Sequence, residues 1–173
     1  MKIITDISSY KQDTPTGVAL GTFDGMHMGH RAVIDGLIEY NRIAVTFEKP
    51  PKSVISGNEE LLMTPEDKYK SLLSYGVNEV FMPKFQEMRD LSPSDFLDML
   101  LKAYNPSAIA CGFNYRFGKD AFGDTKFLSN YCDEKGIKLF VSDAVMYDGE
   151  VVSSSKIRDM ITAGKIEDAN KQI

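Results

Sequence analysis

The sequence predicts an α/β fold built on a doubly wound parallel sheet. Apolar runs of strand length alternate with amphipathic runs of helical length over the whole chain of 173 residues. Apolar residues make up 43% of the chain and charged residues 26%, which are ordinary values for a globular protein. A chain of this length can bury roughly 70% of its unfolded surface in one core, so we expect a single domain over residues 1–173.

The first two strands and the helix between them surround the most informative turn. Residues 17–20 are a short apolar run bounded by proline and glycine, which predicts a buried strand. Apolar residues at helical spacing predict a helix over 31–42, and the apolar run 42–47 predicts a second buried strand. That strand ends at Pro50-Pro51, because consecutive prolines cannot continue a central strand.

A third strand and its helix follow an irregular stretch. Residues 52–63 show no periodic pattern, and Gly57-Asn58 indicates a turn within them. Thr64-Pro65 supplies an N-cap residue and a proline for the first helical position, so a helix begins here and ends at Gly76. The apolar run 77–82 predicts the third strand.

The second half of the chain repeats the alternation. The expected elements are a helix from Ser92 to about Tyr104, a buried strand over 107–111, a helix over 125–135 and a strand over 137–141. A polar loop with aromatic residues, 112–124, separates the fourth strand from its helix. A hairpin around Asp148-Gly149, a helix over 153–163 and a last short helix predict a small C-terminal helical extension.

The turn Gly21–His30, between the first strand and the first helix, has the composition of a phosphate site. It holds three glycines and both histidines of the chain. His27 and His30 are three residues apart, which puts both rings on the same side of a first helical turn. Imidazoles beside a helix N-terminus can donate hydrogen bonds to phosphate oxygens. The turn is neither a Walker loop nor a dinucleotide fingerprint, because its glycines are spaced differently.

Two further loops carry groups suited to a nucleotide. The loop 112–120 alternates aromatic residues with Asn114, arginine and lysine, so it could stack on a flat ring and meet phosphates. Phe117 could equally belong to the core. Three serines, 153–155, precede Arg158 at a helix start, where hydroxyls, N–H groups and a guanidinium suit a triphosphate. All these loops should meet at the carboxyl edge of a parallel sheet.

Charge and composition exclude several classes. The net charge is −5 and no basic block is present, so nucleic-acid binding is not expected. Two cysteines without CxxC spacing fit reduced thiols in a cytoplasmic protein. No signal peptide is recognisable, and no apolar run approaches the ~18 residues that a membrane span needs, so no membrane association is expected.

These motifs resemble one known family. Residues 21–30 resemble the HxGH signature of nucleotidyltransferases, in the longer form found in FAD synthetases, the bifunctional riboflavin kinases/FMN adenylyltransferases. The loop 112–119 resembles the family's Gly-Phe-Asp/Asn-Phe-x-Phe-Gly-Lys, and residues 153–158 are similar to its Ser-Ser-Thr-x-Ile-Arg. Residues 62–68 are similar to its Leu-Leu-Thr-Pro-x-x-Lys. The chain departs from the family at Pro50, where relatives have histidine.

The resemblance implies a Rossmann-like HxGH nucleotidyltransferase fold and transfer of AMP from ATP to FMN, giving FAD and pyrophosphate. His27 and His30 would meet the α-phosphate, and Arg158 the β- and γ-phosphates. The flavin would lie between loops 48–58 and 112–124, against Ile55 and Phe117. Mg²⁺ would bridge the phosphates, with no protein ligand assigned. The remaining expected ATP contacts are Gly21, Thr22, Phe23, Asp24, Gly25, Gly29, Asn114, Ser153, Ser154 and Ser155.

Two alternatives stay open at this stage. Another HxGH nucleotidyltransferase would use a different phosphorylated acceptor, and a non-catalytic module would bind flavin or nucleotide without turnover. The riboflavin kinase domain of the family has no counterpart in these residues, so we expect kinase activity to come from a missing domain or a separate protein.

Overall fold

A five-stranded parallel sheet forms the centre of the computed structural model, which describes residues 4–57 and 61–173. Its strands are β1 (Thr16–Leu20), β2 (Asn41–Val45), β3 (Glu79–Phe81), β4 (Pro106–Gly112) and β5 (Lys138–Ser142). They lie in the order β3-β2-β1-β4-β5, and neighbouring strands pair in parallel. The order reverses at β1, so this is a doubly wound sheet, as the alternating pattern predicts.

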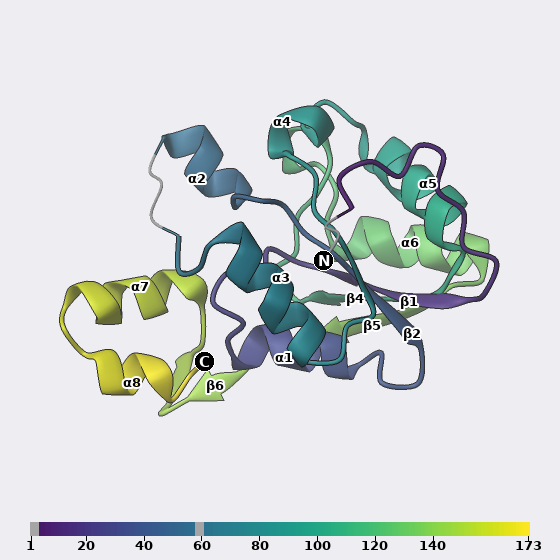
Figure 1. The fold of residues 1–173 in the computed structure, drawn as a ribbon. Coiled ribbons are helices and arrows are strands. Elements are labelled where there is room, and N and C mark those ends of the chain that lie inside the picture. The colour runs from purple at the N-terminus through teal and green to yellow at the C-terminus, as the bar shows by residue number, and fades with distance from the viewer. Residues whose placement is uncertain (1–3, 58–60) are drawn as a thin grey trace.

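Helices cover both faces of the sheet (Figure 1). On one face, α5 (Pro93–Tyr104) and α6 (Thr125–Lys135) pack against the larger side chains of the strands, such as Leu20 and Ile109. On the other, α1 (Met28–Asp35) and α3 (Pro65–Ser74) pack against smaller ones, such as Ala19 and Ala110. Successive strand residues face opposite sides, so each strand contributes to both cores.

The helix boundaries follow their capping residues. The Thr64 hydroxyl accepts the Asp67 N–H at 3.1 Å, and the Ser92 hydroxyl accepts the Asp95 N–H at the same distance. Gly136 ends α6 in the left-handed conformation, with φ +67°. These starts and this end were expected from the sequence. The helix expected over 31–42 was placed too late, because α1 begins at Met28 inside the glycine-rich turn.

Two short helices were not expected. The stretch 52–63 was expected to be irregular, but α2 (Pro51–Ser56) occupies its first part. Pro51 presets the first helical φ angle, and Gly57 ends the helix at φ +70°, so both end signals were present. The expected turn at Gly57-Asn58 lies partly outside the described residues. The second helix is α4 (Phe85–Met88), which follows β3, and a 3₁₀ turn, η1 (Lys119–Ala121), lies in the loop after β4.

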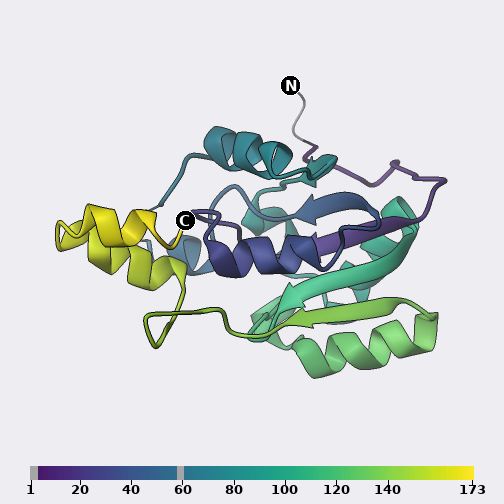
Figure 2. The same ribbon diagram turned by 90° about the horizontal axis from the view of Figure 1, so that it is seen from below.

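The C-terminal extension stands at one end of the sheet. It comprises the hairpin β6 (Met146–Tyr147) and β7 (Glu150–Val151), then α7 (Ser154–Thr162) and α8 (Ile166–Asn170). In Figure 2 the strand arrowheads point towards α7 and α8, so the extension lies beside the carboxyl ends of the strands. This is the edge at which ligands bind in doubly wound sheets.

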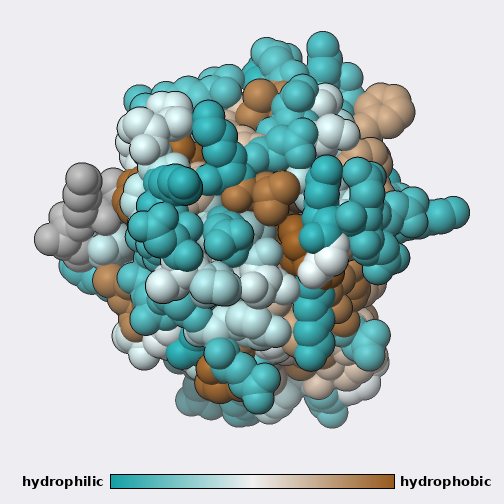
Figure 3. All heavy atoms as spheres, turned by 90° about the vertical axis from the view of Figure 1, so that its right-hand side faces the viewer, coloured by the Kyte–Doolittle hydropathy of each residue, from teal (hydrophilic) through white to brown (hydrophobic). Residues whose placement is uncertain are grey.

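The opposite end of the molecule is mostly hydrophilic. Figure 3 shows this face, where teal side chains surround small brown groups. In the described part of the chain, we find no helix with the length and apolarity needed to cross a bilayer.

Candidate functional site

The turn between β1 and α1 has a strained backbone held in place by packing. Phe23 and Met26 adopt positive φ angles of 48° and 43°, and Gly25 lies between them at 86°. Left-handed conformations are costly for residues other than glycine and persist only where the surroundings enforce them. Here the two apolar side chains are buried in the core, at 0% and 3% exposure. Core packing therefore sets the geometry of this turn.

The two histidines of the turn form a stacked pair. The centroids of the His27 and His30 rings are 3.7 Å apart at an interplanar angle of 19°, which confirms that both rings lie on one side of α1. The Phe23 ring meets His30 edge-on at 5.4 Å. Gly29 allows the stack, because a Cβ atom there would lie 3.2 Å from the His27 ring. The Nδ1 atoms of both histidines are buried without a partner among the described residues.

Both histidines are neutral at physiological pH. Burial lowers the pKa of His27 to about 4. Burial also lowers the pKa of His30 well below its ordinary value. A positive charge on His27 or on Lys68 would repel a proton on His30, which lowers this pKa further. Two imidazoles in van der Waals contact cannot both be charged at low cost. The pair therefore offers neutral N–H and N groups to a ligand rather than two positive charges.

The N-terminus of α1 is less open than the sequence implied. The Met28 N–H, the first of the helix, donates to the carbonyl oxygen of Gln172 at 2.9 Å. The N–H groups of His30 and Arg31 both donate to the His27 carbonyl. The last residues of the chain therefore cover part of the helix start, and fewer N–H groups than expected remain for a phosphate.

An ion pair joins the turn to α7. Arg158 Nη1 lies 2.8 Å from Asp24 Oδ2, and the carboxylate is 1% exposed. The other oxygen of Asp24, Oδ1, accepts the Leu62 N–H at 3.1 Å. Arg158 was expected at the same sheet edge as the histidines. The structure places its guanidinium against the turn, where it contacts the carboxylate of Asp24.

The three serines at the start of α7 differ in accessibility. The Ser153 hydroxyl caps the helix by accepting the Lys156 N–H at 3.3 Å. Ser154 Oγ donates to the Asp24 carbonyl oxygen at 2.8 Å. Ser155 is exposed. Two of the three hydroxyls expected to meet phosphate therefore also hold α7 in place.

Lys68 is the last residue of the motif 62–68, and the sequence analysis assigned it no role in the site. It is 1% exposed, and its Nζ donates to the carbonyl oxygen of Phe47, just beyond β2, at 2.8 Å. Burial lowers the pKa of Lys68 to about 8, and the nearby Asp24 carboxylate opposes that shift. Two signals were present, because the motif ends in this lysine and because Lys68 and Leu72 lie four residues apart on the buried side of α3.

Of the two residues expected to contact the flavin, one is exposed and the other is buried. Ile55, on α2, is 74% exposed. Phe117 is 6% exposed, and its ring lies in the core against Phe96 and Tyr115, at centroid distances of 5.8 and 5.6 Å. The ring therefore packs in the core, as the sequence analysis allowed, and its contact with a flavin stays a prediction. Asn114, in the same loop, is exposed.

A cavity of about 180 Å³ lies beside the segment 48–54, which was expected to form one wall of the flavin site. Its other wall differs from the expected one. Its lining comes from the segment after β2 and from the start of α4: Glu48, Lys49, Val54, Lys84, Phe85 and Gln86. The loop 112–124 does not contribute to this lining. Phe47, next to the cavity, meets Phe85 edge-on at 5.5 Å. The cavity thus combines aromatic and charged groups.

The described residues include no cluster of three or more His, Cys, Asp or Glu side chains suited to holding a metal ion. Asp24, the acidic residue of the turn 21–30, is engaged by Arg158 and the Leu62 N–H. A metal at this site would therefore need oxygen ligands from a substrate.

Solved structures share this arrangement of strands and helices. A crystal structure titled a macrolide-efflux protein from Streptococcus pneumoniae superposes with a TM-score of 0.87 at 25% identity, covering 99% of this chain and 59% of that one. A pantothenate synthetase from Thermus thermophilus superposes with a TM-score of 0.63 at 14% identity, over 91% and 67% of the two chains. The second likeness concerns the fold alone.

Curated proteins resemble the chain in sequence. The bifunctional riboflavin kinase/FMN adenylyltransferase of Listeria monocytogenes is 32% identical over 164 residues, which is 89% of this chain and 52% of that protein. A putative protein of the same name from Geobacillus thermodenitrificans is 30% identical over 87% of this chain and 84% of its own length. The chain spans about half the length of the Listeria relative. The family model for FAD synthetase matches residues 9–156, and the chain therefore belongs to the FAD synthetase family.

Proposed function

We propose that the chain is an FMN adenylyltransferase that transfers AMP from ATP to FMN. An oxygen of the FMN phosphate forms a bond to the α-phosphorus of ATP, and the bond from that phosphorus to the bridging oxygen of pyrophosphate breaks. The products are FAD and pyrophosphate. The observation that carries the proposal is the stacked pair of His27 and His30 at the carboxyl end of β1, in a chain of the FAD synthetase family.

The histidines would act on the α-phosphate. Their pKa values keep them neutral at pH 7, so each ring has one N–H to donate to a phosphate oxygen while charge builds up there. No covalent intermediate with the protein is needed, and catalysis would consist of positioning and charge stabilisation. The buried, strained turn around Phe23 supports this role, because it fixes both rings before the substrate arrives.

The triphosphate would extend from the histidines towards α7. Arg158 and the exposed Ser155 would meet its β- and γ-phosphates. Gly21, Thr22, Phe23, Asp24, Gly25 and Gly29 would form the floor of the ATP site, and the exposed Asn114 would touch the nucleotide. Mg²⁺ would enter with ATP, bound through phosphate oxygens and water, so no step is assigned to a protein-bound metal.

The flavin would enter beside α2. Ile55 is exposed there, and the cavity between the segment after β2 and α4 offers Phe85 and Val54 to a flat ring. Lys49 and Lys84 line the same cavity. Phe117, whose ring is 6% exposed, would support the neighbouring loop and offer the flavin at most its edge.

Chromatography of a reaction mixture tests the proposal. The chain is incubated with FMN, ATP and Mg²⁺, and with riboflavin in place of FMN in parallel. We expect FAD from FMN and no change in riboflavin. Other phosphorylated acceptors are also supplied in place of FMN. Transfer of AMP to one of them, but not to FMN, would assign a different nucleotidyltransferase. ATP binding without any product would favour a non-catalytic binding role.

A further inference from the structure

The carboxylate of Asp24 carries a charge of the same sign as the triphosphate whose site it was expected to line. Only 1% of its side chain is exposed. An ionised carboxylate has acceptors and no donors, so it cannot hydrogen-bond to a phosphate oxygen. The side chain of Asp24 therefore needs a role other than direct contact with ATP.

Three printed contacts fix the position of Asp24. The Leu62 N–H donates to Oδ1 at 3.1 Å, and Ser154 Oγ donates to the backbone carbonyl of Asp24 at 2.8 Å. Arg158 Nη1 donates to Oδ2 at 2.8 Å and supplies the one ion pair of this carboxylate among the described residues. Asp24 thus joins the turn both to α7 and to the segment before α3.

Arg158 keeps donors for a second ligand while it is paired with Asp24. A guanidinium has five N–H groups in a planar fork, and the described residues engage Nη1 alone. The side chain is 24% exposed, so a ligand can reach it. One guanidinium can therefore contact the buried carboxylate and phosphate oxygens at the same time, which suits arginine better than lysine.

We propose that Asp24 is a positioning residue that holds the Arg158 guanidinium in place for the triphosphate of ATP. This inference rests on the proposed use of ATP. A long side chain that moves freely must be ordered when a ligand binds, which costs about twofold to tenfold in affinity. The ion pair with the fixed carboxylate orders Arg158 before ATP arrives.

Two rival roles for Asp24 give different results. A carboxylate that only offset the charge of Arg158 would weaken ATP binding, so its removal would raise the affinity. A carboxylate that only docked α7 on the turn would affect the stability of the fold whether or not Arg158 is present. Positioning instead predicts a loss of ATP affinity that depends on the guanidinium.

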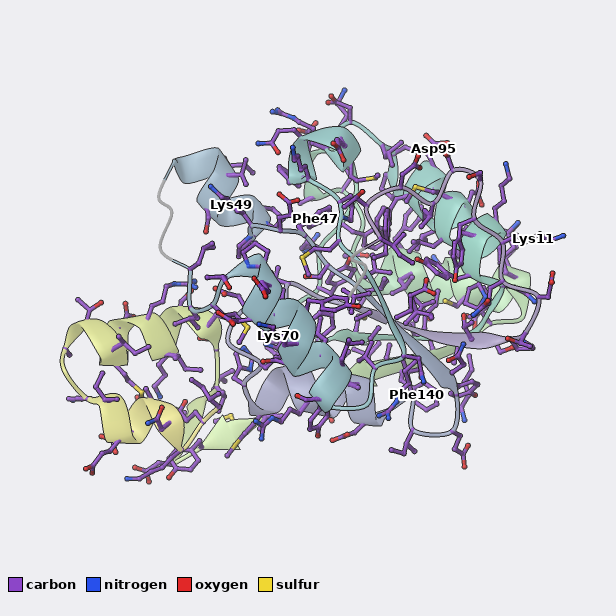
Figure 4. The ribbon with its side chains drawn as sticks, in the orientation of Figure 1. Lys11, Phe47, Lys49, Lys70, Asp95 and Phe140 are labelled. Carbon is purple, nitrogen blue, oxygen red and sulfur yellow. The ribbon has the colours of Figure 1, made fainter. Side chains whose placement is uncertain are left out.

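Calorimetry with ATP compares the unaltered chain with Asp24→Asn, Arg158→Gln and the double variant. Asparagine removes the charge and keeps an acceptor for the Leu62 N–H, and glutamine keeps a donor for the buried carboxylate. Glu66→Gln is the matched control. Glu66 pairs with Lys70 at the same distance, 2.8 Å, but both side chains are exposed on α3 (Figure 4).

We expect Asp24→Asn to raise the Kd for ATP about fivefold, whereas Glu66→Gln should leave it unchanged. In the Arg158→Gln background, Asp24→Asn should change the Kd by less than about 1.5-fold, because no guanidinium remains to be positioned. In the assay of FAD formation, Asp24→Asn should raise the KM for ATP and leave the KM for FMN unchanged. An unchanged or lower Kd in Asp24→Asn would overturn the inference, and so would an equal rise in both backgrounds.

The dynamics of Arg158 in the unaltered chain give a second test that requires no substitution of Asp24. Nitrogen relaxation measured by NMR reports the order parameter of the Arg158 Nε–H group, whose signal is identified by its absence from Arg158→Gln. We expect an order parameter above about 0.6 without ATP, as for an ordered group. A lower value would show that Asp24 does not hold the guanidinium, and would overturn the inference.

The outcomes separate the two proposals. If the unaltered chain makes FAD but Asp24→Asn binds ATP normally, only the role of Asp24 fails. If Asp24→Asn weakens ATP binding as expected but the unaltered chain transfers AMP to an acceptor other than FMN, only the proposed function fails. If the unaltered chain does not bind ATP, both are overturned.

Discussion

The buried histidine pair predicts an acid-sensitive fold. In the folded chain the pKa of His27 is about 4, whereas its ordinary value is 6.5. Between these values the unfolded chain binds a proton that the folded chain rejects, so the free energy of unfolding falls as the pH is lowered. The contribution of His27 to the free energy of unfolding is fully present above pH 6.5, and it is lost as the pH falls to about 4.

The magnitude follows from the two pKa values. A tenfold difference in proton affinity is worth about 1.4 kcal/mol, so a pKa of about 4 in place of 6.5 corresponds to about 3 kcal/mol. Roughly half of this, on the order of 1.4 kcal/mol, should be lost by pH 5.5. His27 is 7% exposed, so little screening by solvent is expected. For a domain with a stability of about 5–15 kcal/mol, this is a large part of the total.

Urea unfolding followed by circular dichroism measures the effect, with His27→Gln as the matched variant. The variant keeps a polar side chain of similar size but does not titrate, whereas the carboxylates titrate in both proteins. We expect the stability of the unaltered chain to fall more steeply than that of the variant from pH 7 to 5, by about 1.4 kcal/mol or more. Parallel curves within about 0.5 kcal/mol would refute the argument that burial lowers the pKa of His27 in the folded chain.

Three further predictions follow from single contacts. His30→Ala should lower kcat for FAD formation about 100-fold, or about 3 kcal/mol, if its ring donates to the reacting phosphate; a near-normal kcat in a chromatographic assay would remove it from the mechanism. Gly118→Ala should destabilise the fold by about 3 kcal/mol, because φ is +72° and the new Cβ would lie 2.8 Å from Pro93. Gly136→Ala, with a similar φ of +67° but open surroundings, should cost only about 1 kcal/mol; equal losses in thermal unfolding would contradict the steric argument. Thr64→Ala removes the cap of α3 and should lower the free energy of unfolding by about 1 kcal/mol, whereas an unchanged urea midpoint would show that the cap contributes nothing.

Much of the fold was predictable because it depends on local rules. The alternating apolar runs predicted the order of strands and helices along the chain. Thr64 and Ser92 predicted two helix starts, and Gly136 predicted one helix end. The spacing of His27 and His30 gave the shared face of their rings, since residues three apart are neighbours on any helix. The weakest local expectation concerned residues 52–63, where the end signals of a short helix, α2, were interpreted as irregular chain.

Only the tertiary structure decided how charges and rings are partnered. Arg158 and Asp24 are 134 residues apart and meet because α7 lies beside the end of β1. Lys68 occupies the inner side of α3, where an apolar residue would be usual, and Phe117 turns into the core although its loop carries polar groups. Periodicity and capping report on neighbours within a few residues along the chain. The partner of a buried charge depends on which distant elements the sheet brings together, and that information is absent from any local pattern.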